Sequence, residues 1–142
     1  MTYVDTSALA KWYLNEARSE EFVTWMQAAS TTYISTLTVV EKRCLLARRR
    51  RNRELPVELE QKVFAALQDD IAHGFLIQQP VDDESVRGAL RLLGLLPVHP
   101  LRTLDALHLS IARNSGSLCL ATADRVMASA AQAIGFEVVR FD

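Results

Sequence analysis

Four carboxylates in this sequence stand where a chain of alternating strands and helices would present them. Asp5 and Asp124 each follow a short apolar, strand-forming segment, and Glu41 and Asp105 are each expected in the first turn of a helix. In open α/β sheets, ligands bind in the crevice beyond the carboxyl ends of the strands. The four positions therefore suggest a single acidic site at that edge of a parallel sheet.

Each acid also has a purely structural alternative. Asp5 could serve only the helix that follows it, although Thr6 or Ser7 occupies the expected N-cap position. Thr38 and Glu41 have the S/T-x-x-E spacing of a capping box, and exposed N–H groups in a first turn stabilise an anion such as Asp105. Capping explains each acid separately, but it does not predict that all of them collect at one edge of a sheet.

Carboxylates gathered at one edge require a cation. Two of them about 5 Å apart repel by roughly 3 kcal/mol at an effective dielectric constant near 20. A divalent cation removes that cost, and oxygen ligands without thiolates or paired imidazoles favour Mg²⁺ or Mn²⁺ over zinc. We therefore expect Asp5, Glu41, Asp105 and Asp124 to form a metal-dependent site.

The elements that must position these acids alternate along the chain. Hydrophobic periodicity predicts strands at the N-terminus and at residues 31–35, 75–78, 118–121 and 136–141, with helices after Asp5 and at residues 18–29, 36–51, 57–72, 82–95, 101–114 and 126–134. The strand at 75–78 is expected to be buried, and Leu104, Leu107 and Ile111 are expected to form the apolar stripe of helix 101–114. The alternation predicts one domain with a parallel sheet flanked by helices.

Charge is nearly balanced, with 16 Lys and Arg against 17 Asp and Glu, so any basic surface for nucleic acid must be local. The one charge block, Arg48-Arg49-Arg50-Arg51-Asn52-Arg53, ends helix 36–51. Two interpretations remain open: contact with RNA phosphates or a partner, and a solvated helix end where the macrodipole favours cations. His108 is interpreted as a hydrogen-bonded, partly buried residue rather than a ligand.

Cysteine usage and hydropathy indicate a cytoplasmic protein. Cys44 and Cys119 lie in apolar runs and are expected to be small buried hydrophobes in a reducing compartment. No run of about 18 apolar residues and no signal-peptide pattern is present, so we expect no membrane segment.

The segments around the four acids resemble the acidic motifs of PIN-domain nucleases, in that family's order. They read Tyr-Val-Asp5-Thr-Ser-Ala-Leu, Thr38-Val-Val-Glu41, Arg102-Thr-Leu-Asp105-Ala-Leu-His-Leu and Ala121-Thr-Ala-Asp124. The length resembles that of the VapC type of bacterial toxin, and the resemblance covers essentially the whole chain. It implies a single PIN domain over residues 1–142, with a three-layer α/β sandwich and a five-stranded parallel sheet ordered 3-2-1-4-5.

The resemblance also implies roles for individual residues. Asp5 and Asp105 would be the main ligands of Mg²⁺, with Glu41 and Asp124 completing the pocket directly or through water. Ser7 and Thr122 would support them through their hydroxyl groups. Some relatives carry a further acidic or amide residue just after the fourth acid, and Arg125 and Val126 stand there in this sequence. The sequence therefore leaves open whether the site holds one metal ion or two.

The activity implied is hydrolysis of RNA phosphodiester bonds by a metal-activated water, in an endoribonuclease that acts as the toxin of a toxin–antitoxin pair. The implied partners are an RNA substrate, a VapB-like antitoxin that blocks the acidic pocket, and a second copy of the chain in a homodimer. Hydrolysis by water does not use the 2′-hydroxyl, so the preference for RNA rests on the resemblance alone.

Three other functions are compatible with parts of the sequence. A PIN-like scaffold could bind RNA or a partner without catalysis. An aspartyl-phosphate phosphatase would need a second acid two residues after Asp5, where Ser7 stands. A metal-independent ribonuclease would need a general acid and base among His73, His99 and His108, and sensitivity to a chelator would distinguish it. The glycines form neither a G-x-G-x-x-G nor a Walker A loop, which excludes the common nucleotide-binding motifs.

Overall fold

Five short parallel strands form the centre of the protein, seen in a computed structural model that describes residues 1–142. The sheet has the order β3-β2-β1-β4-β5, and every neighbouring pair is parallel. This confirms the predicted order 3-2-1-4-5. The strands are β1 (Thr2–Val4), β2 (Thr32–Ser35), β3 (Leu76–Gln79), β4 (Cys119–Thr122) and β5 (Glu137–Arg140).

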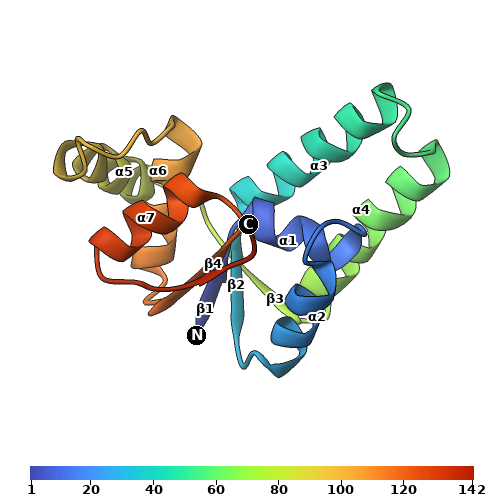
Figure 1. Ribbon diagram of the computed structural model, residues 1–142, viewed down its shortest axis with the longest axis horizontal. Coiled ribbons are helices and arrows are strands. Elements are labelled where there is room, and N and C mark those ends of the chain that lie inside the picture. Colours follow the sequence, from blue (N-terminus) through green and yellow to red (C-terminus); the bar gives the residue numbers. More distant parts are fainter.

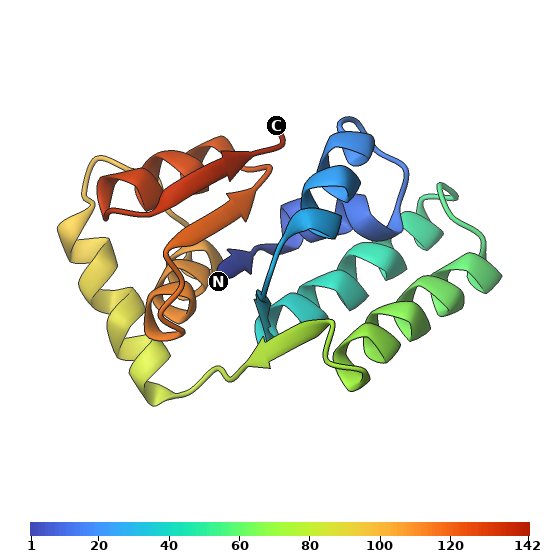
Figure 2. The same cartoon turned by 90° about the horizontal axis from the view of Figure 1, so that it is seen from below.

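Seven helices cover the sheet, with α1 to α4 on one side and α5 to α7 on the other (Figure 1). Figure 2 shows α3 and α4 running side by side in opposite directions, away from the sheet. None of the helices combines the length and apolar character needed to cross a bilayer. The helices are α1 (Thr6–Tyr13), α2 (Ser19–Ala28), α3 (Thr36–Arg51), α4 (Val57–Ala72), α5 (Asp83–Leu95), α6 (Thr103–Asn114) and α7 (Arg125–Ala133).

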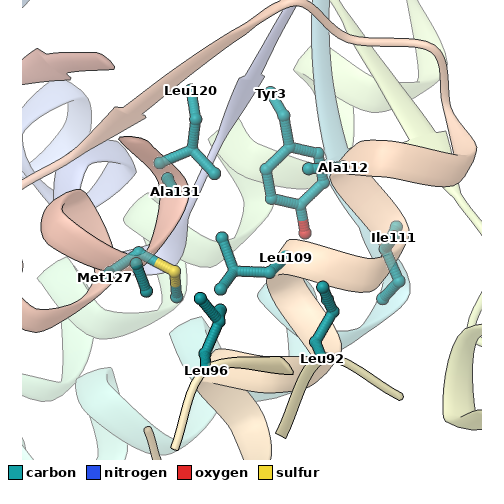
Figure 3. Close-up of a cluster of buried hydrophobic side chains, with 10 residues drawn as sticks. Tyr3, Leu92, Leu96, Leu109, Ile111, Ala112, Leu120, Met127 and Ala131 are labelled. Carbon is teal, nitrogen blue, oxygen red and sulfur yellow. The ribbon is translucent and has the colours of Figure 1, made fainter. Parts of the chain in front are cut away.

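The sheet separates two hydrophobic cores because alternate strand residues point to opposite faces. Tyr3 and its partner Leu120 lie in the core under α5, α6 and α7, whereas Val4 and its partner Ala121 lie in the core under α1, α2 and α4. Figure 3 shows the Tyr3 side chain in the first core, with its hydroxyl directed toward α6. The same strand thus packs into both layers and leads directly to Asp5.

The burial of two predicted elements differs from expectation. β3 pairs only with β2 at the sheet edge, so Leu76 is buried while Ile77 is 40% exposed, and the prediction of a buried strand was wrong. In the predicted stripe of α6, Ile111 is buried as expected and Leu107 is half-buried, but Leu104 is exposed, so its place in the stripe was wrong. Because α6 packs against α5, α7 and β2, its buried face also includes Ala106 and Leu109.

The burial expected for Cys44 was also wrong. Cys44 is exposed, and Cys119 is half-buried; neither forms a disulfide. α3 extends beyond the sheet, so the helix face that carries Cys44 lines a surface cavity instead of the core.

Candidate active site

The centre of the site lies where β1 and β4 are neighbours. Val4 is in register with Ala121, and the backbone N–H of Asp5 donates to the Ala121 carbonyl at 3.1 Å. The chain leaves β1 through α1 and α2 toward β2 on one side, whereas β4 leads through α7 to β5 on the other. This is the switch point of the sheet, where its connections diverge and leave a crevice at the carboxyl ends of the strands.

Asp5 is a buried carboxylate held by hydrogen bonds. It is the N-cap of α1 and accepts the Ala8 N–H at 2.9 Å, so the expectation that Thr6 or Ser7 caps the helix was wrong. The Ser7 and Thr122 hydroxyls donate to its two oxygens at 2.8 and 2.6 Å. Burial raises the pKa of Asp5, although these hydrogen bonds act in the opposite direction. No ion pair of the protein includes Asp5, which therefore lacks a cationic partner.

Asp105 and Asp124 share one arginine. Asp124 is the N-cap of α7, and its backbone N–H donates to the Thr122 hydroxyl at 2.9 Å, which links it to Asp5. Asp105 lies in the first turn of α6, as predicted, and accepts the backbone N–H of Arg102 at 3.0 Å. The Arg102 guanidinium lies 3.1 Å from Asp105 Oδ2 and 3.6 Å from Asp124 Oδ2. Its hydrogen bond to Asp105 raises the pKa of Arg102.

Glu41 is in the second turn of α3, not the first. The capping box is formed by Ser35 and Thr38, whose side chains each bond the other residue's backbone N–H, so the capping role considered for Glu41 was wrong. Glu41 instead accepts the Thr6 hydroxyl at 2.7 Å and Nε2 of His108. Burial acts to raise the pKa of Glu41, but the bonds from His108 and Thr6 outweigh it and leave that pKa below its usual value.

His108 connects Glu41 to the sheet. Its ring is 3% exposed, and Nδ1 lies 2.7 Å from the Tyr3 hydroxyl, so the expectation of a hydrogen-bonded buried histidine is confirmed. A carboxylate only accepts hydrogen bonds, so Nε2 carries the proton toward Glu41, and in the neutral ring the Tyr3 hydroxyl donates to Nδ1. Burial raises the pKa of Tyr3, which keeps this hydroxyl protonated. The chain Tyr3–His108–Glu41 thus fixes the carboxylate from behind.

A cavity of about 830 Å³ opens beside these residues and continues along α3. Glu41, Cys44, Leu45 and Arg48 line it at the i, i+3, i+4, i+7 spacing of one helix face. Ser7, Arg102 and Ala123 line the acidic end, and Arg48, Arg49 and Arg51 line the other. Of the four acids, Glu41 lines the cavity, and Arg102 lines it in front of Asp105 and Asp124.

The arginine block divides into paired and unpaired members. Arg49 forms an ion pair with Glu16, and Arg50 forms one with Glu60. Arg48 and Arg51 are exposed, line the cavity and form no ion pair. Arg53 follows the end of α3 with a φ of 60° and does not line the cavity. The sequence could not separate these residues, because their partners come from other segments.

The donor atoms of the site are carboxylate oxygens, the ligand type that Mg²⁺ prefers. The most deeply buried of these carboxylates, Asp5, accepts hydrogen bonds from hydroxyl groups but has no cationic partner. No three acidic, histidine or cysteine side chains are arranged to hold one metal ion together. Asp105 and Asp124 face Arg102, and Glu41 faces His108. A metal at this site would therefore have to exchange places with the Arg102 guanidinium.

The PIN domain family matches residues 2–133 of this chain. No curated protein matches the sequence significantly. Among solved structures, the chain is similar to VapC20 of Mycobacterium tuberculosis, described as a Sarcin-Ricin loop cleaving toxin, with 20% identity, a TM-score of 0.76 and 99% of each chain covered.

Two further solved structures are also similar. One is FitAcB from Neisseria gonorrhoeae, with 19% identity, a TM-score of 0.67, and 97% of this chain and 96% of that chain covered. The other is VapBC-5 from Mycobacterium tuberculosis, described as a member of the VapBC family of toxin–antitoxin systems, with 18% identity, a TM-score of 0.66, and 98% and 97% covered. At these identities the structural matches establish the fold.

Proposed function

This chain belongs to the PIN domain family, and from that premise we propose that it is a Mg²⁺-dependent endoribonuclease that acts as the toxin of a toxin–antitoxin pair. One observation carries the proposal. Asp5, Glu41, Asp105 and Asp124 gather at the switch point of the sheet, where Thr6, Thr122 and Arg102 bridge them, next to a cavity whose far end is lined by arginines. Acids for a metal and cations for phosphates therefore border one space.

Each contact has a function in this proposal. Asp5 and Asp105 hold Mg²⁺, or Mn²⁺ in its place, and Glu41 and Asp124 complete the pocket directly or through water. The metal supplies Lewis-acid chemistry, a lowered pKa for a coordinated water and compensation of charge on the leaving oxygen. Ser7 and Thr122 orient the two oxygens of Asp5. No protein nucleophile is required.

RNA would cross the acidic pocket and follow the cavity along α3. Arg48 and Arg51 lie seven and ten residues beyond Glu41 on that helix, or about 10 and 15 Å along its axis. Their guanidinium groups are exposed and unpaired, so they are available to phosphates on one side of the scissile bond.

The proposed partners follow from the same site. An unrestrained ribonuclease would damage the cell that makes it, and similar structures include the complexes FitAcB and VapBC-5. We propose a VapB-like antitoxin that blocks the pocket with a basic side chain attracted to the four carboxylates. The toxin would act in the cytoplasm as a homodimer.

Inducible expression in a bacterial host tests this function. The wild type should arrest growth and generate new RNA 5′ ends, which sequencing would locate. Asp105→Asn should do neither, and coexpression of the neighbouring gene's product with the wild type should restore growth. Equal growth in all three cultures would contradict toxin function, and arrest by Asp105→Asn would show that the acidic pocket is not its cause.

A non-catalytic scaffold that binds RNA or a partner is the second candidate. It is favoured by one observation: Arg102 already neutralises Asp105 and Asp124, and no three side chains are arranged for a metal. The scaffold predicts RNA bound to the purified protein and no new 5′ ends after induction. An aspartyl-phosphate phosphatase is less well supported, because Ser7 stands at the position of the second acid and donates to Asp5.

A further inference from the structure

Arg102 is the only lysine or arginine within 4.0 Å of any of the four acids. Its side chain is 76% exposed, whereas the side chains of Asp105 and Asp124 behind it are 10% and 29% exposed. Arg102 lines the cavity and the two carboxylates do not. A cation of the protein's own chain therefore lies between these two carboxylates and the cavity.

We propose that Arg102 is a substrate-positioning residue that exchanges partners: it holds Asp105 and Asp124 in the metal-free protein and contacts an RNA phosphate once a divalent cation is bound. This inference rests on the proposed nuclease function. It adds a residue to the site and assigns that residue two alternative partners.

The first step of the exchange, in which Arg102 leaves Asp105 and Asp124, follows from electrostatic repulsion. A divalent cation bound by Asp105 would compete with the guanidinium for the same oxygens and repel it at close range. Displacing Arg102 costs little, because its guanidinium is largely exposed to water, which weakens the ion pair even though Asp105 is buried. Asp124 Oδ2, which lies 3.6 Å from Arg102, accepts no hydrogen bond from another residue and would be released at the same time.

Geometry favours phosphate as the second partner. Arg102 is the N-cap residue of α6, and its backbone N–H is tied to Asp105 at 3.0 Å, so the displaced guanidinium stays at the rim of the pocket. Its planar set of donors matches two phosphate oxygens. Leu104 and Ala123 are its neighbours in the cavity wall, and the first unpaired arginine along α3, Arg48, is about 10 Å beyond Glu41. Lys11 also lines the cavity, but it is buried and its Nζ donates to the Ala17 carbonyl at 2.6 Å and lies 3.9 Å from Glu16.

Titration calorimetry with Mg²⁺ alone tests whether the metal displaces Arg102 from its carboxylates. It compares the wild type with Arg102→Gln and with the matched control Arg125→Gln. Arg125 directly follows Asp124 and is 81% exposed, but it pairs with Asp142, so its loss removes the same charge without touching the four acids. Arg102→Gln should bind Mg²⁺ roughly two- to fivefold more tightly than the wild type, as expected when a weak competing ion pair is removed. Arg125→Gln should stay close to the wild type.

The salt dependence of RNA binding tests the second half. A single-stranded RNA is titrated with Ca²⁺ in place of Mg²⁺ to prevent cleavage, which a gel verifies, and again in EDTA. With Ca²⁺, Arg102→Gln should lower the slope of log K against log salt by about 0.7, the value for one lost phosphate contact. In EDTA the slope should not change, because Arg102 then remains on its carboxylates. Arg125→Gln should leave both slopes unchanged.

The outcomes separate this inference from the proposed function. An equal loss of slope with Ca²⁺ and in EDTA would show a permanent phosphate contact and overturn the exchange. If the wild type binds Mg²⁺ and cuts RNA, but Arg102→Gln behaves like Arg125→Gln in both titrations, the role of Arg102 alone is refuted. A wild type that neither binds Mg²⁺ nor cuts RNA would refute the proposed function, and the exchange with it.

Discussion

The four carboxylates of the site are stabilised by three kinds of partner: hydroxyl groups, an arginine and a histidine. Asp5 receives hydroxyl groups, Asp105 and Asp124 share Arg102, and Glu41 receives His108. Each partner stabilises negative charge, so the repulsion expected among clustered acids is offset even without a metal. What distinguishes the four carboxylates is therefore how easily each can exchange its partner, and the exposed Arg102 is the easiest to displace.

Lys42 provides a pH-dependent test of the packing behind the cavity. The residue is fully buried, its Nζ has no hydrogen-bond partner and lies 5.3 Å from the centre of the Tyr13 ring, and burial lowers its pKa to about 8. An unfolded lysine has a pKa of about 10.4. The cost of burying the charge is therefore fully present below about pH 8, declines as the pH rises toward 10.4, and is absent above it.

Lys42→Met should therefore raise the free energy of unfolding at pH 7 by about 1–3 kcal/mol, a gain limited by the loss of the contact with Tyr13. At pH 10 the gain should be much smaller. Urea unfolding of both proteins at the two pH values measures the difference. A variant that is less stable than the wild type at pH 7, or a gain that is the same at both values, would contradict the prediction.

Contacts between site residues are easier to predict from the sequence when the two residues are close together along the chain. Asp5 and Asp124 follow strands directly, so their place at the sheet edge was predictable. The R-x-x-D spacing of Arg102 and Asp105 was a visible signal for their contact, since residues three apart face each other on a helix. The bond between His108 and Glu41 joins residues 67 positions apart, and no local pattern indicates it.

Helix α3 combines two kinds of arginine, and their effects should separate. Arg48→Ala/Arg51→Ala should lower the slope of log K against log salt for single-stranded RNA by about 1.4, or 0.7 for each contact. Arg49→Ala/Arg50→Ala removes the same charge but breaks ion pairs with Glu16 and Glu60. That variant should lose thermal stability and keep a slope near the wild-type value. A wild-type slope in Arg48→Ala/Arg51→Ala would instead make the block a solvated helix end or an interface for a partner.

The crossing of α5 and α6 depends on Gly88. A Cβ at this position would lie 2.2 Å from Oγ of Ser110, a buried hydroxyl without a partner, and 3.4 Å from its Cβ. Gly88→Ala should therefore destabilise the protein by about 1–3 kcal/mol. Adding Ser110→Ala removes the clashing atom and should restore most of that loss, while Ser110→Ala alone should be nearly neutral. Denaturant unfolding of the three variants measures the coupling, and additive losses would refute it.

Element boundaries were well predicted where periodicity is strong. α4 has the predicted bounds, 57–72, because it carries a long amphipathic pattern. α3 also has its predicted bounds, 36–51, although it is only weakly amphipathic; it begins at the capping box of Ser35 and Thr38. Burial was less predictable. Whether β3 is central or at the edge depends on strand order, which the β3 segment itself does not encode.

Acidic and basic side chains are unevenly distributed over the molecule, although its net charge is close to zero. A net charge of −1 means that any surface for nucleic acid must be local, and the cavity is lined by Glu41 at one end and by the unpaired Arg48 and Arg51 at the other. The alternation of strands and helices predicts a parallel sheet, and the family resemblance supplied its order. The cavity could not be predicted, since it forms between α1, α3 and α6 only after the sheet brings them together.

Cleavage of RNA by the purified protein tests the central claim most directly. Total bacterial RNA is incubated with the wild type, Asp105→Asn and the control Asp82→Asn, each with Mg²⁺ or excess EDTA. Asp82 is the exposed N-cap of α5, where asparagine caps equally well. Asp105→Asn should change the free energy of unfolding by less than about 1 kcal/mol, because the amide oxygen can still accept the Arg102 N–H and the guanidinium lost as an ion-pair partner is largely exposed. We predict discrete cleavage by the wild type and Asp82→Asn with Mg²⁺, and none by Asp105→Asn or in EDTA. Cleavage that persists in EDTA, or in Asp105→Asn, would contradict the account.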